Sequence, residues 1–577
     1  DNKVPSIFAV TYGYNGNDAP GAELTFGMAS AYVQDEWQIS KKFKLTYGLR
    51  AEMPLYHNKL ENNPAISALT FGDGWTTIDG NLTPSWAYKM DVGSWPKSKI
   101  QISPRVGFNW DVKGDRSLQL RGGTGIFTGM LPFVWFTNQP TNSGMIQSVE
   151  TIITNSTTLA SINFNNGALK FNPNFRQVVD NNPTIFNQNK GALPSTGASL
   201  AEVSKDFKMP QVWRTNIAMD LELPSNMILT LEAIYSKDIN AITQKNVNLS
   251  YPQGNYAGAD TRPFWNTNKI NTNIGNAMVL SNTNKGYQAS FTAQLSKNFS
   301  NGFYGMIAYT YNIAKDVTAN PGSAAYSAWR ANTTTKFLND PELSYSNFST
   351  PHRIVGNVSY KIEYAKHFAT TISLYYSGSN QGRSSYTYSN DMNKDGQTAD
   401  LIYIPKDASE IVFADFKNKN GVVVLTAQEQ SDRFMQYIEE TPYLRNNKGK
   451  YAERYGDVQP WYNRFDMKIL QDLFTNFGSE RKYTLQLSLD ILNVGNLLNS
   501  NWGVYQTHGL GSYENIRPLT FVTKGADNKP QYNLFMTPTT ETNKDVYMND
   551  FNKKAKWNNN LSTGSTWGMQ LGIRFIF

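Results

Sequence analysis

The last eleven residues of the chain, Trp567–Phe577, constrain its fold more than any other stretch. Every second side chain is large and apolar, and the residues between them are small or polar apart from Ile576. This is the period of a β-strand with one apolar face. An exposed edge strand of this kind would invite aggregation in water, whereas a strand of a closed barrel can place its apolar face in lipid. The apolar positions are Trp567, Met569, Leu571, Ile573, Phe575 and Phe577.

Composition agrees with a strand-built membrane protein. Charged residues make up only 17% of the 577 residues, and aromatic residues make up 13%. No run approaches the ~18 apolar residues that a spanning helix needs. There is no cysteine, which excludes disulfide scaffolds and thiolate metal sites. The net charge of +7 comes without a basic cluster, so we expect no nucleic-acid partner.

The same two-residue alternation recurs along the chain in segments of about 10–14 residues, the length that a tilted membrane strand needs. We count about 13 such strands, which predicts an all-β, transmembrane antiparallel barrel. Short turns alternate with long connections. The turns lie near Ser40, Gly114, Ser225, Asn301, Ala365 and Gly478, and the long segments cover roughly 58–97, 130–210, 237–285, 316–350, 379–460 and 496–564. Outer-membrane barrels have short periplasmic turns and long extracellular loops, so we expect a periplasmic C-terminus.

Several motifs resemble those of a known family. Tyr32–Trp37 followed by Leu45–Arg50 is similar to the barrel hairpin of TonB-dependent outer-membrane receptors. Ser103–Trp110 and Arg121–Phe127 resemble stretches of the Oar-like branch of that family, which is related to SusC-like receptors. Asp490–Asn499 resembles the penultimate-strand signature, and the apolar positions of the last strand resemble the signal read by the barrel-assembly machinery.

The resemblance implies a 22-stranded barrel in the outer membrane of a Gram-negative bacterium. An odd number of strands does not close a usual bacterial barrel. We therefore expect residues 22–577 to be the C-terminal part of the barrel, in contact with outer-membrane lipid, and residues 1–21 to be the remnant of an extracellular loop. The N-terminal part of the same receptor would add the remaining strands and the plug, and would contact TonB. By analogy with SusC-like relatives, a surface lipoprotein lid is a further candidate partner.

The implied function is active import of a large or scarce solute, such as an oligosaccharide, a peptide or a protein. Two alternatives remain open at this point. A passive, porin-like channel predicts an even-stranded barrel closed within this chain and no plug. A structural or adhesive surface protein would use the long loops to bind another protein. None of the four histidines His57, His352, His367 and His508 has the spacing of a catalytic triad or a metal site, so we expect no enzyme activity.

The polar faces of the predicted strands carry charges of both signs. Such side chains have no place in a dry core, so as a group they favour a water-filled lumen. We expect most of them to pair with one another or with the plug. The predicted lumen-facing residues are Arg50, Glu52, Arg121, Arg214, Asp220, Glu222, Arg353, Lys361, Arg464, Asp466, Lys468, Asp490 and Arg574.

One loop contains a metal-like motif. Asp391, Asn393 and Asp395 alternate and are followed by Gly396, as in the first half of a calcium loop, and Asp400 follows. An EF-hand would have glutamate where Ile402 stands. Calcium is therefore one reading, with Asp391, Asn393, Asp395 and Asp400 as ligands, and a turn rich in Asp and Asn is the other. We expect no cofactor apart from this ion.

A short helix is predicted after residue 425. Thr426 and Glu429 have the spacing of a capping box. Phe434, Tyr437 and Ile438 then fall on one helical face, so we expect this helix to pack against other loop residues.

Overall fold

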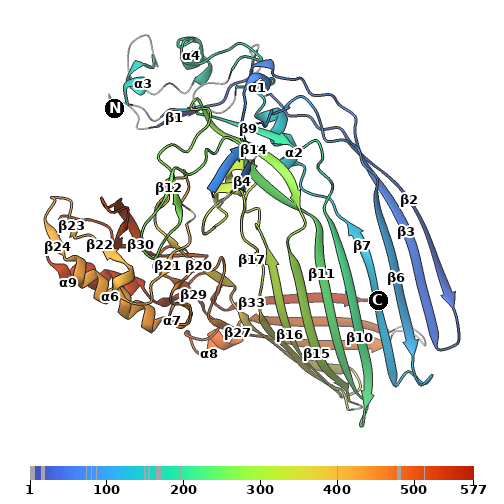
Figure 1. Cartoon of the computed structure of the whole chain (residues 1–577). Helices are drawn as coiled ribbons and strands as arrows, with labels where there is room; N and C mark the ends of the chain where they lie inside the picture. The colour runs from blue at the N-terminus through green and yellow to red at the C-terminus, as the bar shows by residue number, and fades with distance from the viewer. Residues whose placement is uncertain are drawn as a thin grey trace.

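A computed structural model describes most of the chain (Figure 1). The described residues are 7–14, 20–72, 74–78, 81–85, 87–148, 151–153, 156–163, 172, 174–193, 197–299, 301–398, 400–476, 482–512 and 514–577. Long strands form one curved sheet, and the connections at one end of the strands fold into additional small sheets and helices (Figure 1). No helix within these ranges is long and apolar enough to cross a membrane.

Thirteen strands follow one another along the main path of the sheet, in agreement with the predicted number. Each strand pairs with the next one in the order of the sequence, and the pairs are antiparallel. The strands are β2 (Phe26–Gln38), β3 (Phe43–Tyr56), β6 (Gln101–Asp111), β7 (Leu118–Thr128), β10 (Gln211–Leu223), β11 (Met227–Asn246), β15 (Tyr287–Asn298), β16 (Phe303–Asp316), β18 (His352–Tyr364), β19 (Phe368–Asn380), β27 (Trp461–Asn476), β28 (Lys482–Leu492) and β33 (Gly568–Ile576).

Short and long connections alternate along this path. The tight turn between β10 and β11 places Ser225 and Asn226 at φ values of 67° and 58°. The turn between β18 and β19 does the same with Ala365 and Lys366, at 48° and 63°. Consecutive left-handed residues match the twist of a hairpin. The predicted turn at Gly478 lies outside the described residues.

The loop connections nearest the N-terminus fold over the ends of the strands. β11 continues to Asn246, well into the segment expected to be a long loop, and pairs there with β14. The side chains of this extension are buried or intermediate in exposure apart from Lys245, so the alternation that marks a membrane strand is lost. Residues 1–21 contain a short strand, β1, that pairs with β8. The elements are β1 (Phe8–Val10), α1 (Pro64–Ala68), β4 (Gly74–Ile78), β5 (Asn81–Ser85), α2 (Val134–Thr141), β8 (Thr151–Ile153), α3 (Ser156–Ser161), α4 (Phe175–Asp180), β9 (Ala198–Val203), β12 (Gly254–Asn255), β13 (Pro263–Phe264), β14 (Ile274–Thr283), α5 (Ala325–Arg330) and β17 (Ser344–Tyr345).

The last two long connections form a second compact region, which we call the loop domain (residues 383–458 and 505–560). A five-stranded sheet in the order β22-β31-β30-β20-β26 packs against helices α6 and α9 (Figure 1). The elements here are β20 (Arg383–Tyr388), β21 (Tyr403–Ile404), the short helix η1 (Ala408–Glu410), β22 (Val412–Phe413), β23 (Phe416–Lys417), β24 (Val423–Leu425), α6 (Ala427–Glu440), α7 (Pro442–Asn446), β25 (Lys450–Tyr451), β26 (Asp457–Val458), β29 (Tyr505–His508), β30 (Asn515–Lys524), β31 (Pro530–Leu534), α9 (Lys544–Lys554) and β32 (Trp557–Asn560); α8 (Val494–Leu498) precedes its second part.

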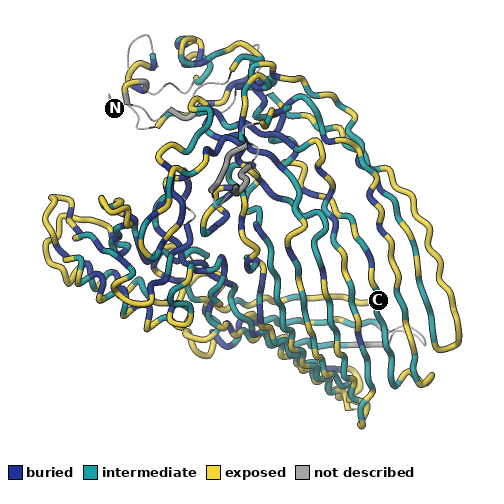
Figure 2. Tube along the Cα trace, in the orientation of Figure 1, coloured by how far each residue is buried: buried dark blue, intermediate teal, exposed yellow. Residues whose placement is uncertain are grey.

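The sequence predicted helix α6 and its cap. The Thr426 side chain accepts from the backbone N–H of Glu429, and the Glu429 carboxylate accepts from the backbone N–H of Thr426. Phe434, Tyr437 and Ile438 are buried on one face, as expected from their spacing. Buried residues gather in the loops, whereas the long strands alternate between intermediate and exposed positions (Figure 2). The main core of the molecule therefore lies outside the large sheet.

The large sheet has two open edges. β2 and β33 stand at the two ends of the path, and among the described strands they do not pair with each other. Unpaired edge strands expose a row of backbone N–H and C=O groups, which cannot remain unsatisfied in lipid.

Candidate functional site

The predicted lumen-facing residues all lie on one face of the sheet. Side chains that stand opposite one another in an antiparallel pair point to the same face. Lys468 stands opposite Ser373 and Asp490, and Asp490 stands opposite Gln570. Following such pairs from β3 to β33 places all thirteen predicted residues on this surface, which we call the charged face. That it lines a lumen stays a prediction.

Many charges on this face are paired. Eight of the thirteen residues form four ion pairs with one another, Arg50–Glu52 at 2.9 Å, Arg121–Asp220 at 3.1 Å, Arg464–Asp466 at 2.8 Å and Lys468–Asp490 at 2.8 Å. Lys361 pairs with Glu363 at 2.6 Å, and Arg214 donates to the Ser236 hydroxyl at 2.9 Å. Glu222, Arg353 and Arg574 show no ion pair within the described ranges. The face is thus polar but largely compensated in charge.

The opposite, apolar face carries the residues predicted to signal barrel assembly. On β33 the side chains of Met569, Leu571, Ile573 and Phe575 are exposed. Trp567 and Phe577 flank the strand and are exposed as well. A row of exposed apolar side chains of this length is what a lipid-facing strand requires.

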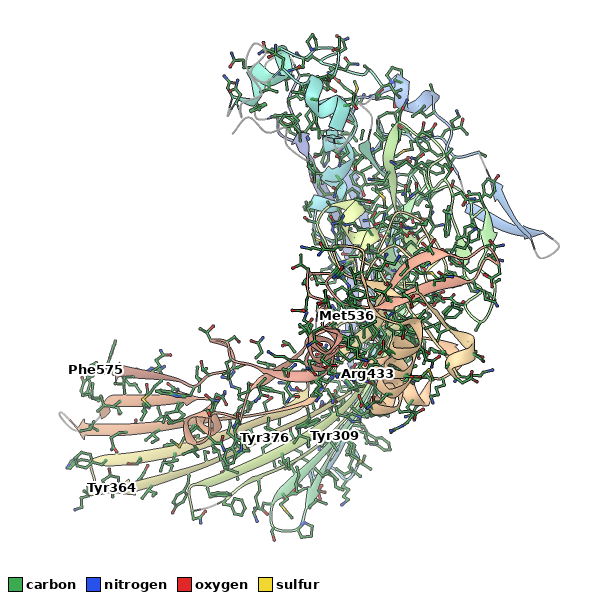
Figure 3. All side chains as sticks on the ribbon, turned by 90° about the vertical axis from the view of Figure 1, so that its left-hand side faces the viewer. Tyr309, Tyr364, Tyr376, Arg433, Met536 and Phe575 are labelled. Atoms are coloured by element: carbon green, nitrogen blue, oxygen red, sulfur yellow. The ribbon has the colours of Figure 1, made fainter. Side chains whose placement is uncertain are left out.

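Aromatic residues mark two levels on the apolar face. Near the loops, Tyr376 packs on Phe465 with ring centroids 4.8 Å apart, and the Tyr309 hydroxyl bonds to Nδ1 of His352. At the opposite end of the strands, Tyr364 packs on Phe368 and Tyr483 packs on Phe575. Figure 3 shows Tyr309 and Tyr376 near the loop end, and Tyr364 and Phe575 at the far end. Two aromatic levels separated by an aliphatic band are the interfacial girdles of a membrane barrel.

A buried ion pair ties the long loops together. Arg262 is fully buried, and its Nε donates to both carboxylate oxygens of Asp260, at 2.9 and 3.1 Å. Its Nη2 donates to the Leu401 carbonyl. The hydroxyls of three tyrosines from the loop domain, Tyr388, Tyr451 and Tyr532, also donate to Asp260. Nη1 of Arg262 has no hydrogen-bond partner among the described residues, although it lies 3.6 Å from Oδ1 of Asp400. A buried ion pair is costly to break by removing one partner, so this pair holds three connections in one arrangement.

The metal-like loop closes largely on its own backbone. The carboxylate of Asp400 accepts from the Met392 N–H at 2.9 Å, and that of Asp395 accepts from the Gln397 N–H at 2.9 Å. Oδ1 of Asp391 is buried without a partner among the described residues. Burial raises the pKa of Asp395, and the neighbouring Asp400 and Asp391 carboxylates raise it further. No group of three or more Asp, Glu, His or Cys side chains in the described part of the chain is arranged to hold a metal. Calcium binding by this loop therefore stays a prediction.

A large cavity lies in the loop domain. It has a volume of about 810 Å³ and is lined by residues of α6, α7, β26, β29 and the α9–β32 segment. Arg433 of α6 and Trp557 of β32 both line it. A second cavity, of about 460 Å³, borders Asp395 and Gln397 of the metal-like loop. Both volumes fall within or near the range of ligand sites in proteins, about 300–1,000 Å³.

Sequence patterns gave no sign that the residues of the larger cavity lie together. They come from four segments that are far apart in the chain, around residues 386, 433–460, 508 and 552–557. The one sequence signal near them is the capping box of α6, which places Arg433 on a helix. Trp557 precedes a run of three asparagines and has no helical or strand periodicity of its own.

Comparison with known proteins gives one family. The sequence model of the family described as "Outer membrane beta barrel domain" matches residues 9–507. No curated protein matches the sequence. Among solved structures, the fold is similar to the outer membrane transporter YddB from Escherichia coli, at 12% identity and a TM-score of 0.38, covering 82% of this chain and 50% of that one. It is also similar to the FrpB iron transporter from Neisseria meningitidis, at 10% identity and a TM-score of 0.35. That match covers 82% of this chain and 42% of the transporter. A mutant form of the ferric enterobactin receptor PfeA from Pseudomonas aeruginosa is similar at 8% identity and a TM-score of 0.35. That match covers 89% of this chain and 53% of the receptor.

The chain spans about half the length of these structures or less. The family match, in contrast, extends over most of this chain and includes twelve of the thirteen strands of the path up to β28. Together with the antiparallel sheet and its apolar face, it settles the broad class. The chain belongs to the family of outer membrane β-barrel domains.

Proposed function

We propose that this chain is the barrel part of a TonB-dependent importer of the outer membrane, in the Oar-like or SusC-like branch. The observation that carries the proposal is the open sheet, in which β2 and β33 each have one edge without a partner among the described strands. A passive porin is a closed barrel, whereas a large receptor barrel has further strands and a plug. The N-terminal part of the same receptor would supply both, and would contact TonB.

The two faces of the wall fit this role. The charged face would meet water and the plug, and its internal ion pairs would limit the number of charges that the plug must satisfy. The apolar face would meet outer-membrane lipid, and its terminal strand would be read by the barrel-assembly machinery. In this orientation the short turns and the C-terminus are periplasmic and the loop domain is extracellular.

The loop domain would capture the solute before transport. It has its own core and a cavity, which a set of mobile surface loops would lack. Connections of this size suit a large or scarce solute, such as an oligosaccharide, a peptide or a protein. A surface lipoprotein could cover the same end of the barrel in the manner of SusC-like relatives.

Energy coupling is the property to test. Uptake of fluorescent peptides and oligosaccharides of increasing size is compared in the parent strain, a strain lacking this protein and a strain lacking TonB. An importer predicts that both deletions abolish uptake of the same solute. Loss of uptake only in the strain lacking this protein would indicate a passive channel and overturn the proposal. Unchanged uptake in both deletions, with loss of surface adhesion, would indicate an adhesive protein.

A further inference from the structure

Arg433 lines the larger cavity of the loop domain, and its guanidinium is only partly hydrogen-bonded. The side chain of Arg433 is 10% exposed and extends from α6 toward α9. Its Nε donates to Oδ1 of Asn552 at 2.5 Å, and its Nη2 donates to Oε2 of Glu440 at 3.1 Å. Its Nη1 is buried and meets no acceptor among the described residues. The protein therefore does not use the full hydrogen-bonding capacity of this guanidinium, which remains a cation beside the cavity.

The acidic groups of the cavity are already engaged. Both carboxylate oxygens of Glu440 accept hydrogen bonds, one from Arg433 and one from Nε2 of Gln436 at 2.8 Å. The Asp457 carboxylate accepts from the Tyr386 hydroxyl at 2.9 Å. Burial raises the pKa of Asp457. Each acid is thus bonded to a neighbouring side chain of the loop domain rather than free in the cavity.

A second cation stands at the rim. Lys556 is exposed, lines the cavity and has no ion-pair partner in the described part of the chain. With Arg433 only partly compensated, the cavity combines two cationic groups with two carboxylates that are bonded internally. Cationic donors of this kind bind carboxylates through charge-assisted hydrogen bonds.

The remaining wall suits an apolar or aromatic body. Trp557 and Tyr443 line the cavity together with Pro442 and Pro460. Burial lowers the pKa of His508 to about 4, so this side chain is neutral at physiological pH. Its ring meets the Trp557 ring edge-on, with centroids 5.3 Å apart. Neutral rings present a flat surface for an apolar group rather than a site for a second charge.

We propose that this cavity binds a carboxylate ligand with an apolar or aromatic body, most simply the C-terminal end of a peptide. Arg433 and Lys556 hold the carboxylate, and the adjacent body packs along Trp557. Figure 3 shows Arg433 among the helices of the loop domain, at the junction with the strands. The inference rests on the proposed function only for its biological purpose, because binding itself requires no transport.

Binding is measured by calorimetry on the full receptor isolated from the outer membrane in detergent. The probes are an N-acetylated tripeptide ending in phenylalanine, the same tripeptide as its C-terminal amide, and digalacturonic acid. We expect the free acid to bind about tenfold or more tightly than the amide, since the amide lacks the charge that the two cations recognise. Equal affinities of acid and amide, or no saturable binding of either acid in the millimolar range, would overturn the proposal. Binding of digalacturonic acid alone would assign the carboxylate site to an acidic sugar and exclude the peptide.

Matched variants locate the site. Lys556→Gln should weaken binding of the acid severalfold and leave the affinity for the amide unchanged. Lys553→Gln removes the same charge from an exposed position of α9 outside the cavity, and it should change neither affinity. Arg433→Lys keeps the charge but loses the planar guanidinium group, and it should weaken binding of the acid about tenfold. If Arg433→Lys does not fold, the comparison of Lys556→Gln with Lys553→Gln tests the site. Equal changes in the affinity of these two variants for the acid would contradict the assignment. Acid binding without TonB-dependent uptake would leave the site standing and refute only the importer.

Discussion

Lys468 on β27 lies directly opposite Asp490 on β28, with its Nζ 2.8 Å from Oδ1 of the aspartate. The two side chains are 47% and 26% exposed, so water screens much of their attraction. We expect Lys468→Gln and Asp490→Asn each to lower the free energy of unfolding, with a coupling of about 0.2–1 kcal/mol in the double variant. Urea unfolding of the purified barrel measures this cycle. Strictly additive effects would show that the pair does not interact in the folded protein.

The two faces of β33 can be distinguished by a single charge. Leu571→Arg places a cation on the apolar face, which costs about 2–4 kcal/mol at the middle of a bilayer. The neighbouring variant Gln570→Arg places the same cation on the charged face and should cost much less. The amount of folded, heat-modifiable protein in outer-membrane fractions reports the difference. Equal tolerance of both variants would contradict the assignment of faces.

Glu202 predicts a pH dependence in the loops. It is buried on β9, and burial raises its pKa to about 7 although its carboxylate accepts from the Asp91 N–H. The folded state thus binds this proton more tightly than the unfolded state. The resulting stability is fully present below about pH 4.5, the unfolded value, and is lost as the pH rises through 7.

We therefore expect local protection of residues 198–203 to fall by up to about 3 kcal/mol between pH 5 and 8. Hydrogen exchange followed by mass spectrometry measures it. Glu202→Gln should remove most of this dependence, whereas Glu61→Gln, at an exposed ion pair with Lys190, should not. A slope that persists in Glu202→Gln would assign the effect to another group.

Arg262 and Asp260 should be far more sensitive than surface ion pairs. Arg262→Met leaves Asp260 charged and buried, which costs about 3–5 kcal/mol. The double variant with Asp260→Leu removes both charges and should recover much of this loss. Thermal unfolding followed by tryptophan fluorescence compares them. Lys529→Gln, in the exposed pair with Asp527, should stay within about 0.5 kcal/mol of the parent. A double variant as unstable as Arg262→Met would mean that packing, not charge, sets the cost.

Calcium binding to residues 391–400 makes a separate prediction. A divalent cation would relieve repulsion among Asp391, Asp395 and Asp400, whose pKa values burial raises. We expect calcium to raise the thermal stability of the loop domain, and Asp395→Asn to abolish this effect without lowering the stability in a chelator. Magnesium serves as the control ion. An unchanged melting temperature in millimolar calcium would leave the loop as a turn closed by its own backbone.

The barrel strands were predictable because one face of each strand is polar and the other is apolar, so polar and apolar residues alternate along the sequence. β33 shows this best, since Leu571 and Ile573 alternate with Gly572 and Arg574. The same rule located the thirteen strands, the short turns and the residues of the charged face. It failed at Lys237–Asn246, where β11 continues into the loops, pairs with β14 over its last residues and has buried or intermediate side chains apart from Lys245.

The loop domain was not predictable in this way. Its strands are short, and β20 pairs with β30 although more than a hundred residues separate them. Only α6 could be located, because a capping box is a local signal. Arg433 and Trp557 line one cavity through tertiary packing alone, which no spacing within one segment encodes. The Asp391 motif was visible, but its hydrogen bonds to the backbone of the loop were not.

The bonds to Asp260 also set an order of events during folding. Asp260 lies in the connection that follows β11. Its partners Tyr388 and Tyr451 follow β19, and Tyr532 follows β28. Contacts that join such distant parts of a chain form slowly, because long segments must close first. The loop domain can be completed only after nearly the whole polypeptide is available, because Tyr532 follows β28. Until then the buried pair of Asp260 and Arg262 lacks part of its enclosure.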